Sequence, residues 1–169
     1  MENAEEQRFA MPVIELTTLI AAPIERVFDL SRSIDLHADS ASGSGERAVG
    51  GVTSGLIGFG EEVTWRARHF GIWQLLTVRI TQFEQPVHFA DVMVRGAFRR
   101  MEHHHHFGLA PDGTIMRDVF SFQSPLGILG RIANWLFLTR YMRFFLIERN
   151  RFLKAIAESD DWKRYFGHD

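Results

Sequence analysis

Between residues 62 and 123 the chain alternates apolar and polar residues in short runs joined by very short connections. Parallel strands need crossovers of a dozen or more residues, so these runs predict antiparallel hairpins. "EEVTWRARHF" (61–70) and "IWQLLTVRITQF" (72–83) both alternate with a period of two, and Gly71 between them allows a tight turn. "PDG" (111–113) marks another turn, because proline presets φ and glycine accepts positive φ.

The segments on either side of this region complete the fold prediction. "MPVIELTTLI" (11–20) is typical of a first strand, and Pro23 and Ser33 are suited to the starts of two short helices. After Pro125 the apolar residues recur at helical spacing, which predicts one helix of roughly 25 to 30 residues up to about Ala157. The order favours an α+β fold in which a curved antiparallel sheet of about six to seven strands wraps around the long C-terminal helix.

A chain of 169 residues, 46% of them hydrophobic, is expected to form one domain with a sizeable core. We predict a disordered tail over residues 1–10, a single domain over 11–158 and a C-terminal tail over 159–169. The glycine-rich stretch 43–60 is predicted to contain a strand through "ERAV" (46–49), with the rest a lid or hairpin turn. It does not fit a phosphate-binding loop, because Glu61 and Glu62 follow the last glycine.

Composition excludes several kinds of function. The absence of cysteine excludes disulfides, thiolate catalysis and zinc–thiolate sites. A net charge of -2 gives no reason to expect nucleic acid as a partner. No apolar run reaches the roughly 18 residues of a spanning helix, and the acidic N-terminus does not resemble a signal peptide. We therefore expect a cytoplasmic protein, either a monomer or a homodimer.

Four consecutive histidines, His103 to His106, lie within a predicted strand. Side chains alternate across a sheet, so His103 and His105 share a face with apolar residues, whereas His104 and His106 share a face with Arg100 and Glu102. The first pair is therefore expected to point inward and the second to solvent. Four adjacent histidines of one strand cannot converge on one ion.

Asp118 lies on the strand after the PDG turn and falls opposite or diagonal to His105, depending on register. Three interpretations of His103, His105 and Asp118 remain open. They form a hydrogen-bonded patch within the core, they orient a polar group of a ligand, or they act in acid–base catalysis. A metal site would need further ligands, such as His69 or His37. We expect no metal and no cofactor.

The remaining candidates for ligand contact are inward-facing apolar residues of the predicted sheet and long helix. The predicted ligand-binding set is Trp65, His69, Met93, Met101, His103, His105, Phe107, Asp118, Phe120, Phe122, Leu129, Ala133 and Leu136. The inner face of "VHFADVMVR" (87–95) stays undecided, since Phe89 and Met93 or the alternate residues could face the core. If Phe89 and Met93 face inward, so does Asp91, which then needs a partner such as Arg95.

The order of elements and several stretches resemble the SRPBCC superfamily of helix-grip proteins. These stretches are "AAPIERVFDLSRSIDLH", "GGVTSGLIGFGEEVTWRARHFGIWQ", "FADVMVRGAFRRMEHHHHF", "DGTIMRDVFSFQSPLGILGRIA" and "RNRFLKAIAE". The superfamily includes START, birch-pollen-allergen-like and polyketide cyclase/dehydrase-like proteins, and this chain looks like one of its uncharacterised bacterial subgroups. The resemblance covers Pro12 to about Glu158. It implies an apolar cavity for lipids, polyketides, isoprenoid quinones or similar molecules.

Three classes of function follow. The first is binding or transport of a hydrophobic small molecule between sheet and helix. The second is a cyclase or dehydratase that uses His103 or His105 with Asp118. The third is a protein or membrane-surface adaptor, because several arginines lie along the predicted helix near aromatic residues. These arginines are Arg131, Arg140, Arg143, Arg149 and Arg151.

Overall fold

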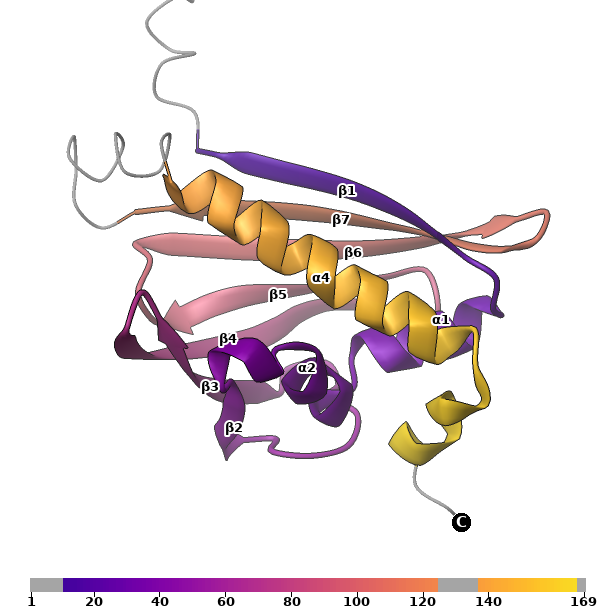
Figure 1. The fold of residues 1–169 in the computed structure, drawn as a ribbon, viewed down its shortest axis with the longest axis horizontal. Helices are drawn as coiled ribbons and strands as arrows, with labels where there is room; N and C mark the ends of the chain where they lie inside the picture. Colours follow the sequence, from indigo (N-terminus) through magenta and orange to yellow (C-terminus); the bar gives the residue numbers. More distant parts are fainter. Residues whose placement is uncertain (1–10, 125–136, 167–169) are drawn as a thin grey trace, which may run out of the picture.

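The computed structural model describes residues 11–124 and 137–166 and contains a seven-stranded antiparallel sheet. The strands follow the order β1-β7-β6-β5-β4-β3-β2, so the first strand pairs with the last (Figure 1). Their bounds are β1 Val13–Ile20, β2 Arg47–Gly51, β3 Glu62–His69, β4 Ile72–Glu84, β5 His88–Arg95, β6 Arg100–Ala110 and β7 Gly113–Gln123. The predicted antiparallel hairpins are confirmed from β3 to β7.

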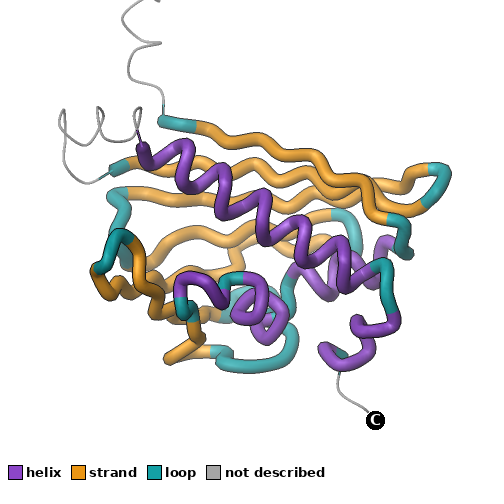
Figure 2. The backbone as a smooth tube through the Cα atoms, in the orientation of Figure 1, coloured by secondary structure: helices purple, strands orange, loops and turns teal. Residues whose placement is uncertain are grey.

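Helices lie on one side of the sheet. The long helix α4 (Thr139–Ala157) runs diagonally across the sheet, beside α1 (Ile24–Ser31) and α2 (Ile34–Ser40) (Figures 1 and 2). A short 3₁₀ helix, η2 (Ser42–Ser44), follows α2. The predicted α+β helix-grip architecture, with two short helices after the first strand, is thus confirmed. No helix in the described part of the chain is both long enough and apolar enough to cross a membrane.

Local sequence explains where several elements begin and turn. The Ser33 side chain accepts a hydrogen bond from the backbone N–H of Leu36 and caps α2, as predicted. Phe70 and Gly71 both adopt positive φ, 52° and 78°, which is the conformation that a two-residue hairpin loop requires between β3 and β4. Such loops fix the register of the strands that they join.

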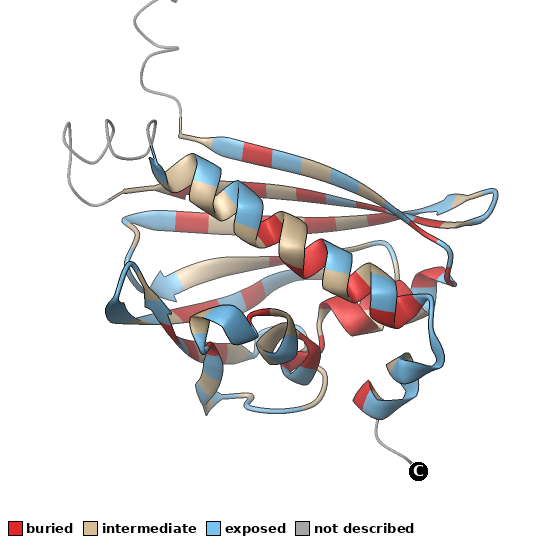
Figure 3. Cartoon of the chain, in the orientation of Figure 1, coloured by how far each residue is buried: buried red, intermediate tan, exposed pale blue. Residues whose placement is uncertain are grey.

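Register places one set of side chains against the helices. On β7, and on β6 as far as Phe107, buried residues alternate with more exposed ones, as the red bands in Figure 3 show. Met101, His103, His105 and Phe107 are the buried set of β6, so the predicted facing of the histidine run is confirmed. The inner face of the sheet therefore carries two histidines within an otherwise apolar surface.

The C-terminal boundary differs from the prediction. We predicted a tail from residue 159, but Asp160–Tyr165 form a second 3₁₀ helix, η4. Tyr165 is buried, and its hydroxyl donates a hydrogen bond of 2.8 Å to Asp39. The polar start of the segment hid this anchoring, because the aromatic residue that packs comes only at its end.

The long helix was predicted from Leu126 onward, and the described part of α4 begins at Thr139. Its buried residues lie in its second half, from Leu146 to Ala157. The earlier part of the predicted helix falls within residues 125–136, outside the described residues. The predicted tail over residues 1–10 also lies outside them.

Candidate functional site

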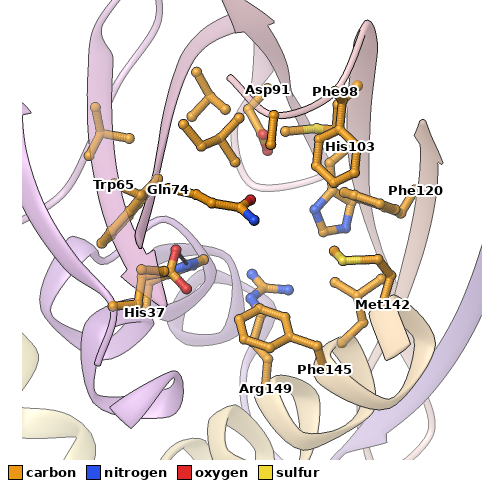
Figure 4. Close-up of a pocket in the computed structure, with 18 of the residues that line it drawn as sticks. His37, Trp65, Gln74, Asp91, Phe98, His103, Phe120, Met142, Phe145 and Arg149 are labelled. Atoms are coloured by element: carbon orange, nitrogen blue, oxygen red, sulfur yellow. Dashed lines mark hydrogen bonds and ion pairs between the residues drawn. The ribbon is translucent and has the colours of Figure 1, made fainter. Parts of the chain in front are cut away.

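A cavity of about 380 Å³ lies between the inner face of the sheet, α2 and the first half of α4. Figure 4 shows side chains from the sheet and from α4 surrounding an open centre. Most of the wall is apolar and includes Trp65, Val78 and Phe120 of the sheet and Met142 and Phe145 of α4. A volume of this size falls in the range of cavities that hold small organic molecules.

About half of the predicted ligand-contact residues line this cavity. They are Trp65, His69, Met101, His103, His105 and Phe120. Phe107 and Phe122 are buried in the core away from the cavity, and Met93 packs against the core from a partly exposed position. Leu129, Ala133 and Leu136 lie outside the described residues.

Asp118 was also predicted to contact a ligand, but it lies behind the cavity wall, fully buried. It is directly opposite His105 in the β6–β7 register. Its Oδ1 accepts a hydrogen bond from Nε2 of His103 at 3.1 Å and lies 2.8 Å from Nδ1 of His105. The predicted approach of the two histidines to Asp118 is confirmed, although the carboxylate contacts them from the side away from the cavity.

Asp118 also joins the sheet to α4. Asn150 donates a 2.7 Å hydrogen bond to Asp118 Oδ2, and Arg149 lies 3.4 Å from Oδ1. Arg149 also donates to the backbone carbonyl of Ser31 in α1. We define the Asp118 network as Asp118, His103, His105, Arg149 and Asn150. It links β6, β7 and α4 and, through Ser31, α1.

Asp91 settles the open question about β5. Asp91 and Phe89 both line the cavity, so this strand faces inward with its odd-numbered residues. The predicted partner was Arg95, but Arg95 is exposed, and Asp91 Oδ1 instead lies 3.4 Å from Nε2 of His105 on the neighbouring strand. The register that pairs Asp91 with His103 of β6 brings these groups together.

His105 therefore lies between two carboxylates. Its Nε2 contacts Asp91, but the short contact of Nδ1 with Asp118 lacks the geometry of a hydrogen bond, so Nδ1 is buried without a hydrogen-bond partner among the described residues. Asp91, His103 and His105 each offer one ligand atom, and these atoms lie within 4.8 Å of one another. Among the described residues of the cavity wall, these three form a group that could hold a metal ion.

Burial and neighbouring charge set the protonation of the network. Burial, and then the charge of His105, lower the pKa of His103 to about 4, so this imidazole is neutral at pH 7. Burial alone would raise the pKa of Asp118. Its contacts with both histidines and the charge of Arg149 outweigh burial and hold that pKa well below its usual value. Asp118 is consequently a buried carboxylate anion, and Arg149 is its cationic neighbour.

Other polar groups of the cavity were not among the predicted contacts. The Gln74 side chain reaches into the open centre in Figure 4 and makes no hydrogen bond to another described residue. His37 stacks on Trp65 with ring centroids 4.2 Å apart, at the opposite side of the cavity from His103. Tyr141 of α4 forms a 2.6 Å hydrogen bond with His69 of β3. These contacts place polar groups on several sides of the apolar space.

Arg149, grouped by sequence with the other helix arginines as support for a membrane-surface role, is instead buried. A signal was present in the sequence. Arg149 lies three residues after Leu146 and four before Leu153, so helical spacing places it on the apolar stripe. A charged residue on such a stripe needs a buried partner of opposite charge.

Comparisons of sequence and structure give different results. The sequence matches no protein-family model and no curated protein. The fold matches the di-domain ARO/CYC StfQ from the steffimycin biosynthetic pathway with a TM-score of 0.71 and 13% identity, over 91% of this chain and 53% of that one. A START superfamily protein from Mycobacterium smegmatis matches with a TM-score of 0.65 and 12% identity, over 86% and 97% of the two chains.

Major latex-like protein 151 from Panax ginseng also matches, with a TM-score of 0.65 and 14% identity over 88% of this chain and 99% of that one. At these identities the likeness concerns the fold alone. It agrees with the curved antiparallel sheet, the two short helices after the first strand and the long C-terminal helix described above. The chain therefore has an SRPBCC-type helix-grip fold.

Proposed function

We infer that this protein binds a hydrophobic small molecule bearing a neutral polar group in the cavity between the sheet and α4. The observation that carries this proposal is the cavity of about 380 Å³, whose walls are mainly apolar but include a few polar groups. Binding sites for small molecules combine these two features, since apolar walls supply affinity and polar groups fix orientation.

The charges of the cavity favour a neutral polar group, such as a carbonyl or hydroxyl. Arg149 and Asp91 both line the cavity, but Arg149 already pairs with Asp118 and Asp91 already contacts His105, so neither is left as a counter-ion for a charged ligand. Gln74 offers an amide donor and an amide acceptor that no described residue occupies. A carbonyl or hydroxyl of the ligand could use either of them without opposing a buried charge.

Catalysis of the cyclase or dehydratase type is the second candidate, because His103 and His105 line the cavity and both contact Asp118. The pKa of His103, about 4, weighs against it. An efficient general base has a pKa near the working pH, and a group with a pKa near 4 accepts protons weakly at pH 7. His103 is better suited to hydrogen bonding with a ligand than to proton abstraction.

Native mass spectrometry of freshly purified protein, followed by organic extraction, would identify a co-purified ligand. The matched test is Ala67→Phe, which places a benzyl group inside the cavity, compared with Arg68→Phe, which places one on the exposed face of the same strand. We expect Ala67→Phe to abolish co-purification and Arg68→Phe to preserve it, with circular dichroism confirming that both variants fold. Equal ligand content in both folded variants would contradict the proposal.

Binding and turnover assays with the ligand identified in this way would also distinguish a carrier, an enzyme and an adaptor. A carrier should retain most of its affinity when His103→Gln is made, whereas an enzyme should lose turnover while still binding. An adaptor should be indifferent to Ala67→Phe and lose vesicle binding when the exposed Arg140 and Arg143 are changed to glutamate.

A further inference from the structure

The outer face of the sheet, opposite the cavity, carries a second group of histidines. His104 and His106 are two residues apart on β6, so their side chains share one face of the sheet, opposite to the face that carries His103 and His105. His88 of β5 pairs directly with His106 across the two strands. The sequence predicts only that His104 and His106 face solvent, because the register that adds His88 cannot be read from β6 alone.

The three rings lie close together and nearly parallel. The centroid of His88 lies 5.4 Å from that of His104 and 4.5 Å from that of His106, with interplanar angles of 10° and 13°. Nε2 of His88 lies 3.1 Å from Nδ1 of His104. All three residues offer a ring nitrogen within 4.8 Å of the other two.

These spacings are close to those of a metal site. Two imidazole nitrogens bound to one tetrahedral Zn²⁺, at about 2.05 Å each, lie roughly 3.3 Å apart. The His88–His104 pair already has nearly this separation. His106 needs only a side-chain rotation, which its partly exposed position allows.

Glu102 supplies a separate observation in favour of a metal ion. Its Oε1 accepts a hydrogen bond of 2.8 Å from Nε2 of His104. A histidine that binds a metal usually donates its other ring N–H to a carboxylate, which fixes the tautomer and the ring orientation. With Nε2 committed to Glu102, Nδ1 of His104 is the nitrogen left to bind, and it is the one that faces His88.

We propose that His88, His104 and His106 form a binding site for one late first-row divalent transition-metal ion, with Glu102 orienting His104. Imidazole nitrogen suits Zn²⁺, Cu²⁺ and Ni²⁺. Three histidines leave a fourth tetrahedral position, which here faces solvent and would take a water molecule. This site is separate from the cavity and does not depend on the proposed function.

The test measures Zn²⁺ affinity by competition with a chromophoric chelator, on protein carrying no histidine tag. His88→Gln is the decisive variant, because His88 is distant in sequence from the run 103–106. We expect one Zn²⁺ per chain, an affinity loss above ~100-fold for His88→Gln, and a loss of roughly 10- to 100-fold for Glu102→Gln, as is typical when a histidine loses its orienting carboxylate. His103→Gln, on the inner face, should change the affinity little.

Two results would overturn the proposal. Unchanged affinity in His88→Gln would show that the histidine run binds the ion without β5. Loss of binding in His103→Gln would place the ion in the inner group with Asp91 and His105 instead. Thermal unfolding provides a readout of folding, since Zn²⁺ that binds the folded chain should raise the melting temperature of the wild type and of His103→Gln but not of His88→Gln.

Discussion

Replacement of Asp118 by asparagine should destabilise the fold strongly while leaving its shape intact. Asp118 is fully buried, and Arg149, only 4% exposed, lies 3.4 Å from it. Loss of one partner of a buried ion pair leaves the other charge uncompensated and costs about 3–5 kcal/mol. We therefore expect Asp118→Asn to lower the free energy of unfolding by about that amount.

Urea denaturation measures this change, and an unchanged m-value would confirm that the variant unfolds from a comparable native state. Glu15→Gln is the matched control, because Glu15 forms an ion pair with Arg117, next to Asp118 on β7, and both side chains are about half exposed. Exposed pairs contribute at most about 1 kcal/mol, so this control should change stability little.

A double variant tests the assignment to the pair. Because Arg149→Met removes the stranded charge, Asp118→Asn combined with Arg149→Met should be less destabilised than the sum of the two single variants. A cost of Asp118→Asn below about 1 kcal/mol, or additive costs in the double variant, would show that the Asp118–Arg149 pair does not stabilise the fold in this way.

Two further predictions concern the sheet. Since unfolded histidine takes up a proton near pH 6.5 while buried His103 stays neutral to about 4, the unfolded state binds more protons as pH falls. The wild type should therefore lose about 2 kcal/mol more stability than His103→Gln between pH 7 and pH 5 in urea titrations, and parallel losses would contradict the lowered pKa. Gly113→Ala should destabilise by more than about 1 kcal/mol, since Gly113 has a φ of 146° and an added Cβ would lie 2.1 Å from the Ile20 carbonyl oxygen. Gly108→Ala, whose added Cβ would meet nothing within 4 Å, is the control and should be nearly neutral. Thermal melts of both variants would measure the difference.

Much of the fold could be predicted from local sequence. The alternation around His103 and His105 predicted which side chains face inward, because a period of two leaves only two choices for a strand. Ser33 predicted the start of α2 because an N-cap hydroxyl accepts its hydrogen bond from a backbone N–H two or three residues further along the chain. Such features depend on neighbours within a few residues, so no tertiary information is needed.

The site depended on information that no single segment contains. Asp91 contacts His105 only through the β5–β6 register, and the same register brings His88 to His106. Helical spacing could place Arg149 on the buried stripe, but its compensating charge, Asp118, lies 31 residues away on another element and could not be identified from the helix. Groups that gain a partner through pairing of distant strands or helices cannot be assigned from their own segment alone.

The two halves of α4 have different roles in the structure, and this bears on how such a protein could change over evolution. The Asp118 network and the buried apolar residues hold the second half, whereas Met142 and Phe145 of the first half face the cavity. Under the proposed function, substitutions at those two positions would change the shape of the cavity without touching the Asp118 network. Ligand preference would then be free to diverge among descendants while the anchored half keeps the scaffold unchanged.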